Sequence, residues 1–287
     1  MIEQSLYEHL IAQESLEPYL TRYNDVPAVF NQEAPPDSDR GWDDGSQYGR
    51  IVFAVDLQGD PERIMSGTLS VDIMCHEEEQ APEEIEPVVR SLIHGWFFSR
   101  DTFTVAAQWK NSAYFTQVKD HVVGCTITFE LLGFPVLGSG RPDLIRHANH
   151  WTREAFRGVH VINHDPLPYP AWKPSGQDSA VYWRLMGDKP AGWIRDTYAT
   201  VWRTGSLKCH VFSEDLATAA ELSRAIAIRL HAAKRWKTEE DGPIIVNRGN
   251  RVDDSADPLR TGQVTVEATY GVIVHFVPDD CFNNINY

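Results

Sequence analysis

The stretch that decides the fold is Ser66-Gly-Thr-Leu-Ser-Val-Asp-Ile-Met-Cys75, followed by an acidic turn and the run 82–93. Leu69, Val71 and Ile73 alternate with polar residues, which is the period of a strand with one buried face. In the run 82–93 the apolar residues recur at helical spacing instead. The stretch therefore predicts a strand, a charged turn and an amphipathic helix.

The same pattern occurs a second time, beginning with Thr204-Gly-Ser-Leu-Lys-Cys-His-Val-Phe-Ser213. The two strands align at one constant offset, which pairs Gly205 with Gly67, and we expect a strand-entry bulge at both glycines. At the same offset the helices pair Val88 with Ile226 and Leu92 with Leu230. Generic α+β segments could match by chance, but the shared order of elements favours a duplication.

The sequence as a whole predicts an α+β fold of two tandem related units, each a mostly antiparallel β-sheet flanked by helices. The expected boundaries are a first unit at 1–137, a linker at 138–142, a second and diverged copy at 143–278, and a flexible C-terminal tail at 279–287. Long loops are expected at 31–47, at 57–64 and between the predicted strands 103–107 and 122–131.

The charge is concentrated in the first half of the chain. Residues 1–138 contain 23 acidic and 8 basic residues, so the entire formal net charge of −15 lies there. Such a surface argues against tight binding to a phosphate backbone, although it allows DNA to pass by. We find no apolar run of about 18 residues and no signal-peptide pattern at the N-terminus, so we expect neither membrane insertion nor secretion.

The four cysteines are widely spaced, and none belongs to a CxxC pair. We interpret them as free thiols of a protein made in a reducing cytoplasm, most of them facing the core. They are Cys75, Cys125, Cys209 and Cys281.

Four histidines fall within a short segment. His147 and His150 lie three apart on a predicted helix, and His160 and His164 follow it. Such a group could ligate zinc or nickel. Neither HExxH nor a CxxC pair accompanies it, so surface histidines are the preferred interpretation. A metal-dependent enzyme using these four residues stays open as the alternative of a different class.

Carboxylates are dense in the acidic turn and at the start of the predicted helix 82–93, and all of them are expected to be solvated. They are Glu77, Glu78, Glu79, Glu83, Glu84 and Glu86. Acidic residues at a helix N-terminus are favoured by its dipole, which needs no catalytic role. GxSxG, Walker and GxGxxG motifs are absent. The sequence predicts no catalytic, cofactor-binding or metal-binding residue.

Tryptophans at loops and element ends are the remaining candidates, because exposed aromatic side chains often mark protein interfaces. Together with three carboxylates of the acidic turn they form the predicted ring or partner interface. This set is Trp42, Trp109, Trp172, Trp193, Glu77, Glu78 and Glu79.

The first unit resembles the tail terminator family of long-tailed bacteriophages, also called tail-completion or minor tail protein U-like proteins. The resemblance is carried by the N-terminal helix, the extended Val26–Phe30, the strands 51–55 and 66–75, the helix 82–97 and the closing strand 122–131. It covers residues 1–136 well and 143–278 more weakly. This chain differs from the family in being about twice as long.

The resemblance implies a structural virion protein with no active site. Family members form a ring that caps the tail tube and joins the tail of a siphophage to the head connector, with DNA passing through the lumen. The expected partners are further copies of the chain, the tail tube protein, and the connector or head-completion protein at the neck. The expected location is the tail-neck junction of the virion, after assembly in the host cytoplasm.

Two arrangements are compatible with the duplication. Three chains could form a pseudo-hexamer, or six chains could form a hexamer whose second units decorate the outside. The difference in charge between the halves favours the decorated hexamer. Rival functions are another neck or tail tube protein of the same particle, and a host adaptor with no role in a virion.

Overall fold

The computed structural model describes residues 2–43, 46–60, 63–100, 103–117, 121–138, 140, 142–176, 178–236, 244–247 and 249–274. The chain forms two compact units. Unit 1 comprises Met1–Val136 and Pro166–Lys173, and unit 2 comprises Leu137–Asp165 and Pro174–Tyr287. The first change of unit lies at the predicted boundary, but the return of Pro166–Lys173 to unit 1 was not predicted. The expected tail at 279–287, Cys281, and residues 139 and 141 of the expected linker lie outside the described residues.

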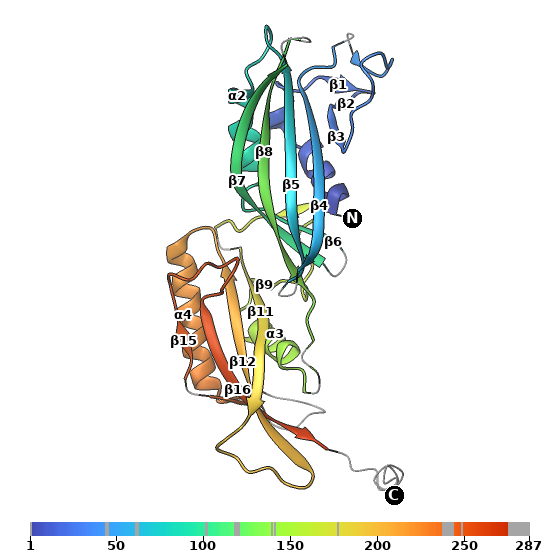
Figure 1. Ribbon diagram of the computed structural model, residues 1–287. Helices are drawn as coiled ribbons and strands as arrows, with labels where there is room; N and C mark the ends of the chain where they lie inside the picture. Colours follow the sequence, from blue (N-terminus) through green and yellow to red (C-terminus); the bar gives the residue numbers. More distant parts are fainter. Residues whose placement is uncertain are drawn as a thin grey trace, which may run out of the picture. The chain divides into compact units, whose positions relative to one another are not determined.

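Unit 1 is built on a mixed sheet with the strand order β10-β6-β7-β8-β5-β4-β3 (Figure 1). Its elements are α1 (Ile2–Ile11), η1 (Glu14–Leu16), β1 (Arg22–Tyr23), β2 (Val26–Pro27), β3 (Val29–Asn31), β4 (Arg50–Asp60), β5 (Ile64–His76), α2 (Pro82–Ile93), β6 (Phe97–Arg100), β7 (Phe103–Gln117), β8 (Val122–Pro135) and β10 (Ala171–Trp172). β3 joins β4 in parallel and the other neighbours are antiparallel.

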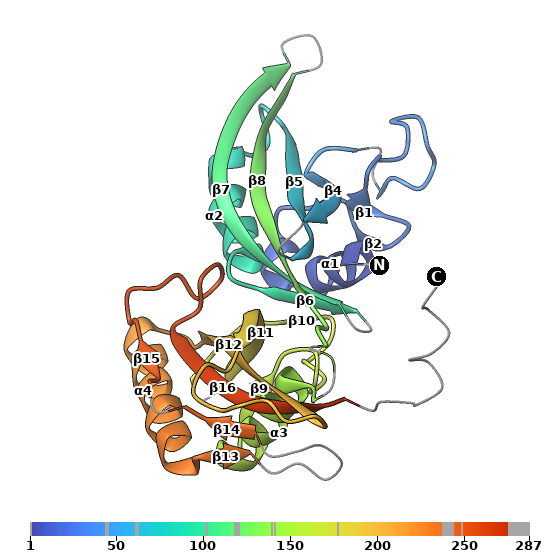
Figure 2. The ribbon, with the colours of Figure 1, turned by 60° about the horizontal axis from the view of Figure 1, so that its bottom comes forward.

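The core of unit 1 lies between one face of the sheet and its two helices. Leu69, Val71 and Ile73 of β5 are fully buried, as their alternation predicted. They belong to one cluster with Leu6 of α1 and Val89 of α2. Figures 1 and 2 show both helices on this face of the sheet, while the opposite face carries no helix of the unit among the described residues.

Unit 2 has a second mixed sheet, with the strand order β13-β14-β16-β12-β11-β9 and β15 paired to β16. Its elements are α3 (Leu144–Ala155), β9 (Val159–Val161), β11 (Ser179–Pro190), β12 (Thr200–Phe212), α4 (Leu216–Ala233), β13 (Arg235–Trp236), β14 (Ile244–Val246), β15 (Arg251–Val252) and β16 (Val264–Ile273). Asp143 and Asp215 cap α3 and α4 by accepting backbone N–H bonds of the first turn.

The two sheets share one topology. In each, a short strand runs parallel to the first long strand, which forms an antiparallel hairpin with the next, and the helix after that hairpin leads to the strands on the far side. The prediction of mostly antiparallel sheets is therefore confirmed, with one parallel pair in each sheet as the exception. The cross-strand pair Phe53 and Val71 of unit 1 corresponds to the cross-strand pair Trp183 and Cys209 of unit 2.

The helices correspond less simply than the strands. Ile226 and Leu230 of α4 are fully buried, whereas their predicted counterparts Val88 and Leu92 are only partly buried. The fully buried residues of α2 stand one position further along, at Val89 and Ile93. The pairing of helices at the strand offset was wrong by one residue.

Strands in unit 1 are longer than the sequence predicted. The expected loop at 57–64 is largely the end of the β4–β5 hairpin, in which Asp60 still faces Ile64. Much of the expected loop after residue 107 is strand as well, since β7 continues to Gln117. Polar residues there conceal the strand, because neither face of this part of β7 is fully buried.

Neither glycine of the repeated stretch lies at a bulge. The register is continuous through Gly67, where an added Cβ would lie 1.9 Å from the backbone oxygen of Asp56. At Gly205 an added Cβ would lie 2.4 Å from the Leu144 side chain. The register shift in unit 2 falls between Leu185 and Gly187 on the facing strand. Close packing, and not a bulge, explains both glycines.

Candidate functional site

The long strand β7 has a free edge over much of its length. β8 pairs with β7 along its whole length, whereas β6 pairs only with residues 103–106 on the other side. Backbone bonds to Gly95 and Trp96 extend this contact to Ala107. Residues 109–117, which we call the β7 edge, have no strand partner on that side among the described residues. An unpaired strand edge is a template for pairing with another chain.

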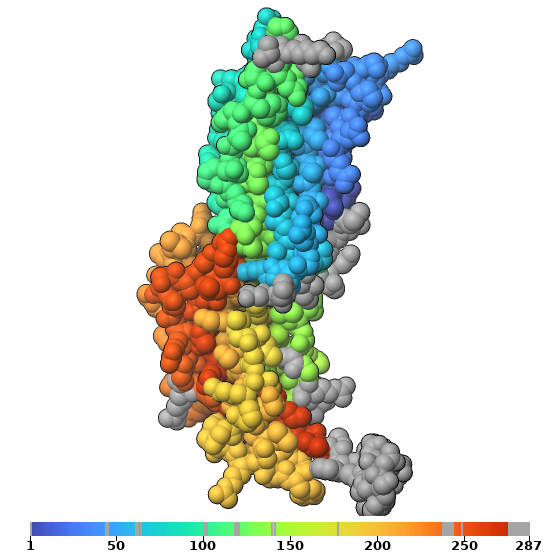
Figure 3. All heavy atoms as spheres, in the orientation of Figure 1, coloured from blue at the N-terminus to red at the C-terminus, as the bar shows by residue number. Residues whose placement is uncertain are grey.

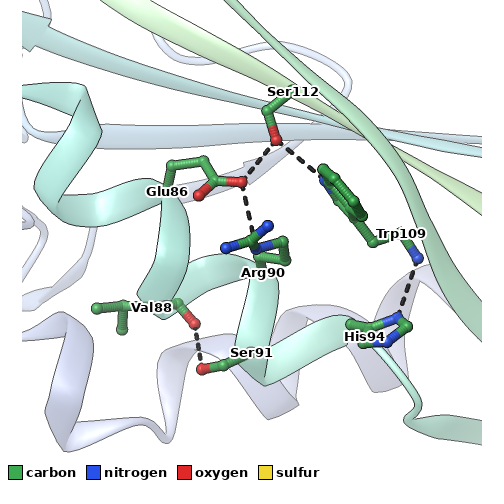
Figure 4. A network of polar contacts seen from close by, with 7 residues as sticks. All are labelled: Glu86, Val88, Arg90, Ser91, His94, Trp109 and Ser112. Atoms are coloured by element: carbon green, nitrogen blue, oxygen red, sulfur yellow. Dashed lines mark hydrogen bonds and ion pairs between the residues drawn. The ribbon is translucent and has the colours of Figure 1, made fainter.

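A network of polar contacts lies where the β7 edge begins (Figure 4). The Trp109 backbone N–H donates to Nδ1 of His94 at 3.2 Å, and the Trp109 indole N–H donates to Oγ of Ser112 at 3.0 Å. Ser112 Oγ in turn donates to Oε1 of Glu86 at 2.6 Å. A register shift in β7 between Trp109 and Asn111 brings the side chains of Trp109 and Ser112 together.

Arg90 completes this network from α2. Its Nε lies 3.4 Å from Oε1 of Glu86, and its guanidinium stands 4.9 Å from the centroid of the Trp109 ring. Trp109 remains 37% exposed, so part of its ring faces solvent although these contacts hold it in place. A tryptophan fixed by an arginine is the kind of anchor that dominates binding energy at protein interfaces.

Because Nδ1 of His94 accepts the Trp109 N–H, this ring nitrogen carries no proton. Desolvation, with the positive charges of Lys173 and Arg90, lowers the pKa of His94 below its usual value. The bond from the Trp109 N–H to Nδ1 assigns the proton of the neutral ring to Nε2. At Trp109, a hydrogen bond to the His94 side chain therefore takes the place of the backbone bond that a neighbouring strand would accept.

The face of the unit 1 sheet that no helix covers is polar and acidic. On this face Asp56 and Glu130 lie on either side of Thr68 of β5. Asp72 lies further along β5, opposite Thr126, which donates a hydrogen bond to it at 2.6 Å. Figure 3 shows the face as a continuous surface of side chains running from β4 to β7. Negative charges on such a surface oppose the close approach of a polyanion.

Two of the four predicted interface tryptophans are buried. Trp42 is 6% exposed, and its indole N–H donates to the Pro36 carbonyl at 3.1 Å. Trp172 is 4% exposed on β10 and lies 5.4 Å from the Phe97 ring. The argument from exposed aromatic side chains was wrong for these two residues, because proline-rich segments fold them into unit 1.

The other members of the predicted interface set are at the surface. Glu77, Glu78 and Glu79 are exposed in the turn after β5, and Glu77 pairs with His121 at 3.0 Å. Trp193 is 61% exposed between β11 and β12 of unit 2, beside Lys234 and Arg235. Of the whole set, only Trp109 joins the network at the β7 edge, so the predicted residues do not form one site.

Glu86 is the residue that the sequence reasoning misjudged most. It was grouped with solvated carboxylates, but it is 6% exposed. The available signal was its position on α2, one residue from the buried Ile85. Its partner Ser112 could not be found from the sequence. A bulge in β7 brings Ser112 next to Glu86, and this part of β7 was predicted as a loop.

Two of the four candidate histidines contact charged neighbours, and the three described cysteines are buried. His150 pairs with Glu154 at 3.3 Å, and Nε2 of His164 lies 3.3 Å from the Arg153 guanidinium. In the described ranges, no group of three or more His, Cys, Asp or Glu could hold a metal ion. Burial raises the pKa of both Cys75 and Cys125 to about 11, so these buried thiols stay protonated.

No protein-family model matches the chain, and a search of curated proteins gives no significant match. Among the described residues, no helix has the length and apolar character needed to cross a membrane.

Proposed function

We propose that this protein is a ring-forming structural component of a bacteriophage neck, of the tail terminator type that the sequence resembles. The observation that carries the proposal is the β7 edge, a long unpaired strand edge with the anchored Trp109 beside it. Pairing of this edge with a neighbouring copy would close strands from several chains into one wall.

The uncovered face of the unit 1 sheet gives that wall an inner surface. We place it toward the lumen, where Asp56, Asp72 and Glu130 would face passing DNA. Like charges keep the duplex from adhering, and no base-specific contact is needed. The acidic balance of residues 1–138 thus has a role in the proposed channel.

The shared topology supports the duplication that the sequence suggested. The correspondence extends from sheet order to cross-strand neighbours, and it includes the parallel pairs β3–β4 and β9–β11. Independent units of this size have many other ways to order a sheet. We therefore propose that the two units are diverged copies of one ancestral unit.

The copies differ at the strand edge that matters for a ring. In unit 2 the strand equivalent to β8 is β16, and two short strands occupy its far side. β14 pairs with residues 268–270 of β16, and β15 pairs with 264–265. A counterpart of the long β7 edge is missing from the described part of unit 2. This favours six chains with decorating second units over three chains in a pseudo-hexamer.

Lysine substitution at the edge tests this function. The exposed residues Asn111 and Ala113 lie on the β7 edge, and a lysine on an edge strand opposes pairing with another strand. We expect Asn111→Lys with Ala113→Lys to abolish oligomers of the purified protein. Thr68→Lys, on the same face but on the central strand β5, is the matched control and should leave oligomers intact.

Two outcomes would count against the proposal. Oligomers that survive both edge lysines show that the β7 edge is not the contact. Open filaments of the unaltered protein indicate the rival role of a tail tube protein, which stacks as well as forming rings. Within the described ranges no group of three or more His, Cys, Asp or Glu could hold the metal of the rival enzyme hypothesis, and native mass spectrometry would also report any bound metal.

A further inference from the structure

Unit 1 contains a groove of about 850 Å³ beside β3, the last strand at one end of its sheet. The first two turns of α1, the β1–β2 hairpin, β3 and residues 33–36 bound it. It is separate from the β7 edge, because β3 and β7 are divided by β4, β5 and β8.

The walls of this groove are aromatic rings and prolines. Tyr23 and Phe30 meet edge to face with ring centroids 5.7 Å apart, and Tyr7 faces the groove from α1. Pro27 and Pro36 contribute further apolar surface. Rings of this kind offer large contact area at a small cost in conformational entropy.

The rings are fixed from behind by Trp42, which explains why this tryptophan is buried. Its ring centroid lies 5.1 Å from that of Tyr23 and 5.5 Å from that of Phe30. Its indole N–H donates to the Pro36 carbonyl, which ties the loop 33–36 to the same cluster. The groove is therefore formed before any ligand arrives, and its binding surface is preorganised.

The groove is acidic as well as aromatic. Glu3 and Glu33 are the acidic residues that line it, and no lysine or arginine is among the lining residues. A ligand that carries a positive charge is favoured by this arrangement, and an acidic one is repelled.

Addition of a strand to β3 fits this edge poorly. The carbonyl of Asn31 already accepts a hydrogen bond from the Glu33 N–H at 2.9 Å. The prolines at the rim have no N–H to donate. A ligand that binds through ring stacking is favoured over one that binds through a main-chain ladder, and extended proline-rich segments use aromatic grooves in this way.

We propose that the groove between α1 and β3 binds a proline-rich, extended segment of a partner protein, with a Lys or Arg of that segment placed near Glu3 and Glu33. The prolines lie against Tyr7, Tyr23 and Phe30, and the basic side chain pairs with the carboxylates. The proposal does not depend on ring formation through the β7 edge, so either can fail alone.

Fluorescence anisotropy with the full-length protein tests it. The probe is a fluorescein-labelled short peptide of repeated Leu-Pro-Pro that contains one Arg, compared with two further peptides. One replaces the Arg by Glu, and the other keeps the Arg but replaces every Pro by Ala. We expect saturable binding of the first peptide and at least tenfold weaker binding of the other two, since each loses one half of the recognition.

Variants assign the binding to the groove. Glu3→Gln combined with Glu33→Gln should weaken binding of the Arg peptide about tenfold, as expected when charge-assisted contacts are lost. Glu77→Gln, at an exposed carboxylate away from the groove, should leave binding unchanged. The proposal is overturned if the first peptide does not saturate, if the alanine peptide binds equally well, or if the groove variant and the Glu77 variant behave alike.

Discussion

Replacing Trp172 by alanine should release the segment 166–173 from unit 1. The side chain is 4% exposed, and β10 pairs with the sheet through Ala171 and Trp172, which lie opposite Phe98 and Phe97. Burial of a tryptophan covers roughly 150–250 Å² of surface, which at about 25 cal/mol per Å² contributes ~4–6 kcal/mol. Substitutions of this kind cost about 3–5 kcal/mol in protein cores.

The lower part of that range is expected for Trp172→Ala. β10 is a two-residue strand at the end of the sheet, so the segment can detach without leaving a closed cavity. Lys173 adds one further contact, a hydrogen bond from Nζ to the His94 carbonyl at 3.0 Å. We therefore expect the free energy of opening of this segment to fall by about 3 kcal/mol, which increases the fraction of open molecules roughly 100-fold.

Hydrogen exchange followed by mass spectrometry measures this opening locally. Peptides that cover 97–100 and 166–173 should exchange faster in Trp172→Ala, while peptides of unit 2 should not change. Trp193→Ala is the matched control, because this tryptophan is 61% exposed and its removal should alter stability by no more than about 0.5 kcal/mol. Unchanged exchange in both peptides of Trp172→Ala would refute the assignment of this segment to unit 1.

The other predictions concern buried polar groups, each measured by denaturant unfolding. Glu86→Gln should cost about 1–3 kcal/mol, because it weakens the bonds to Ser112 and Arg90, whereas Glu84→Gln on the exposed side of α2 should cost less than about 0.5 kcal/mol. Equal effects of these two variants would show that the network is not stabilising. Thr152→Val should cost about 1–3 kcal/mol, since the buried Trp183 indole N–H loses its acceptor at 2.9 Å, and Thr152→Ser should largely restore stability. A valine variant as stable as the serine variant would exclude this bond as the cause. Burial lowers the pKa of His9 below its unfolded value, against the raising effect of its bond to the Leu92 carbonyl. The unfolded state therefore binds the proton more readily, so stability is complete above the unfolded pKa of about 6.5 and is lost as pH falls from there toward the lowered folded pKa. His9→Gln should lose less stability than the unaltered protein between pH 7.5 and 5.5, and an identical loss would contradict this role of His9.

The sequence predicted those elements whose side chains are buried on one face. The alternation in 66–75 and 204–213 located β5 and β12, and both are interior strands of their sheets. Their shared order with the following helices anticipated the common topology. Burial supplies the periodic signal, so elements with one fully buried face can be read directly.

Elements without a fully buried face were missed. β7 beyond residue 107 has no fully buried residue, so its sequence Gln108–Gln117 has the polarity of a loop. The hydrogen bonds of β8 hold it as a strand, and these depend on residues distant in the sequence. The free β7 edge could not be predicted for the same reason.

Tryptophan position was a poor guide to exposure. Trp42 and Trp172 follow polar or proline-rich stretches that resemble surface loops, yet both are enclosed by residues far away in the chain or by neighbouring rings. Trp193 also follows a segment with Pro and Gly, yet it remains 61% exposed. The composition of the neighbouring sequence does not show which tryptophans are enclosed by residues far away in the chain.

Electron microscopy of the purified full-length protein, combined with native mass spectrometry, tests the central claim most directly. Pairing through the β7 edge predicts closed rings with a central hole and six chains in each ring. Rings of three chains would contradict the decorated hexamer while keeping the ring itself. Monomers alone at every concentration, with no closed particle in the images, would contradict the proposed function.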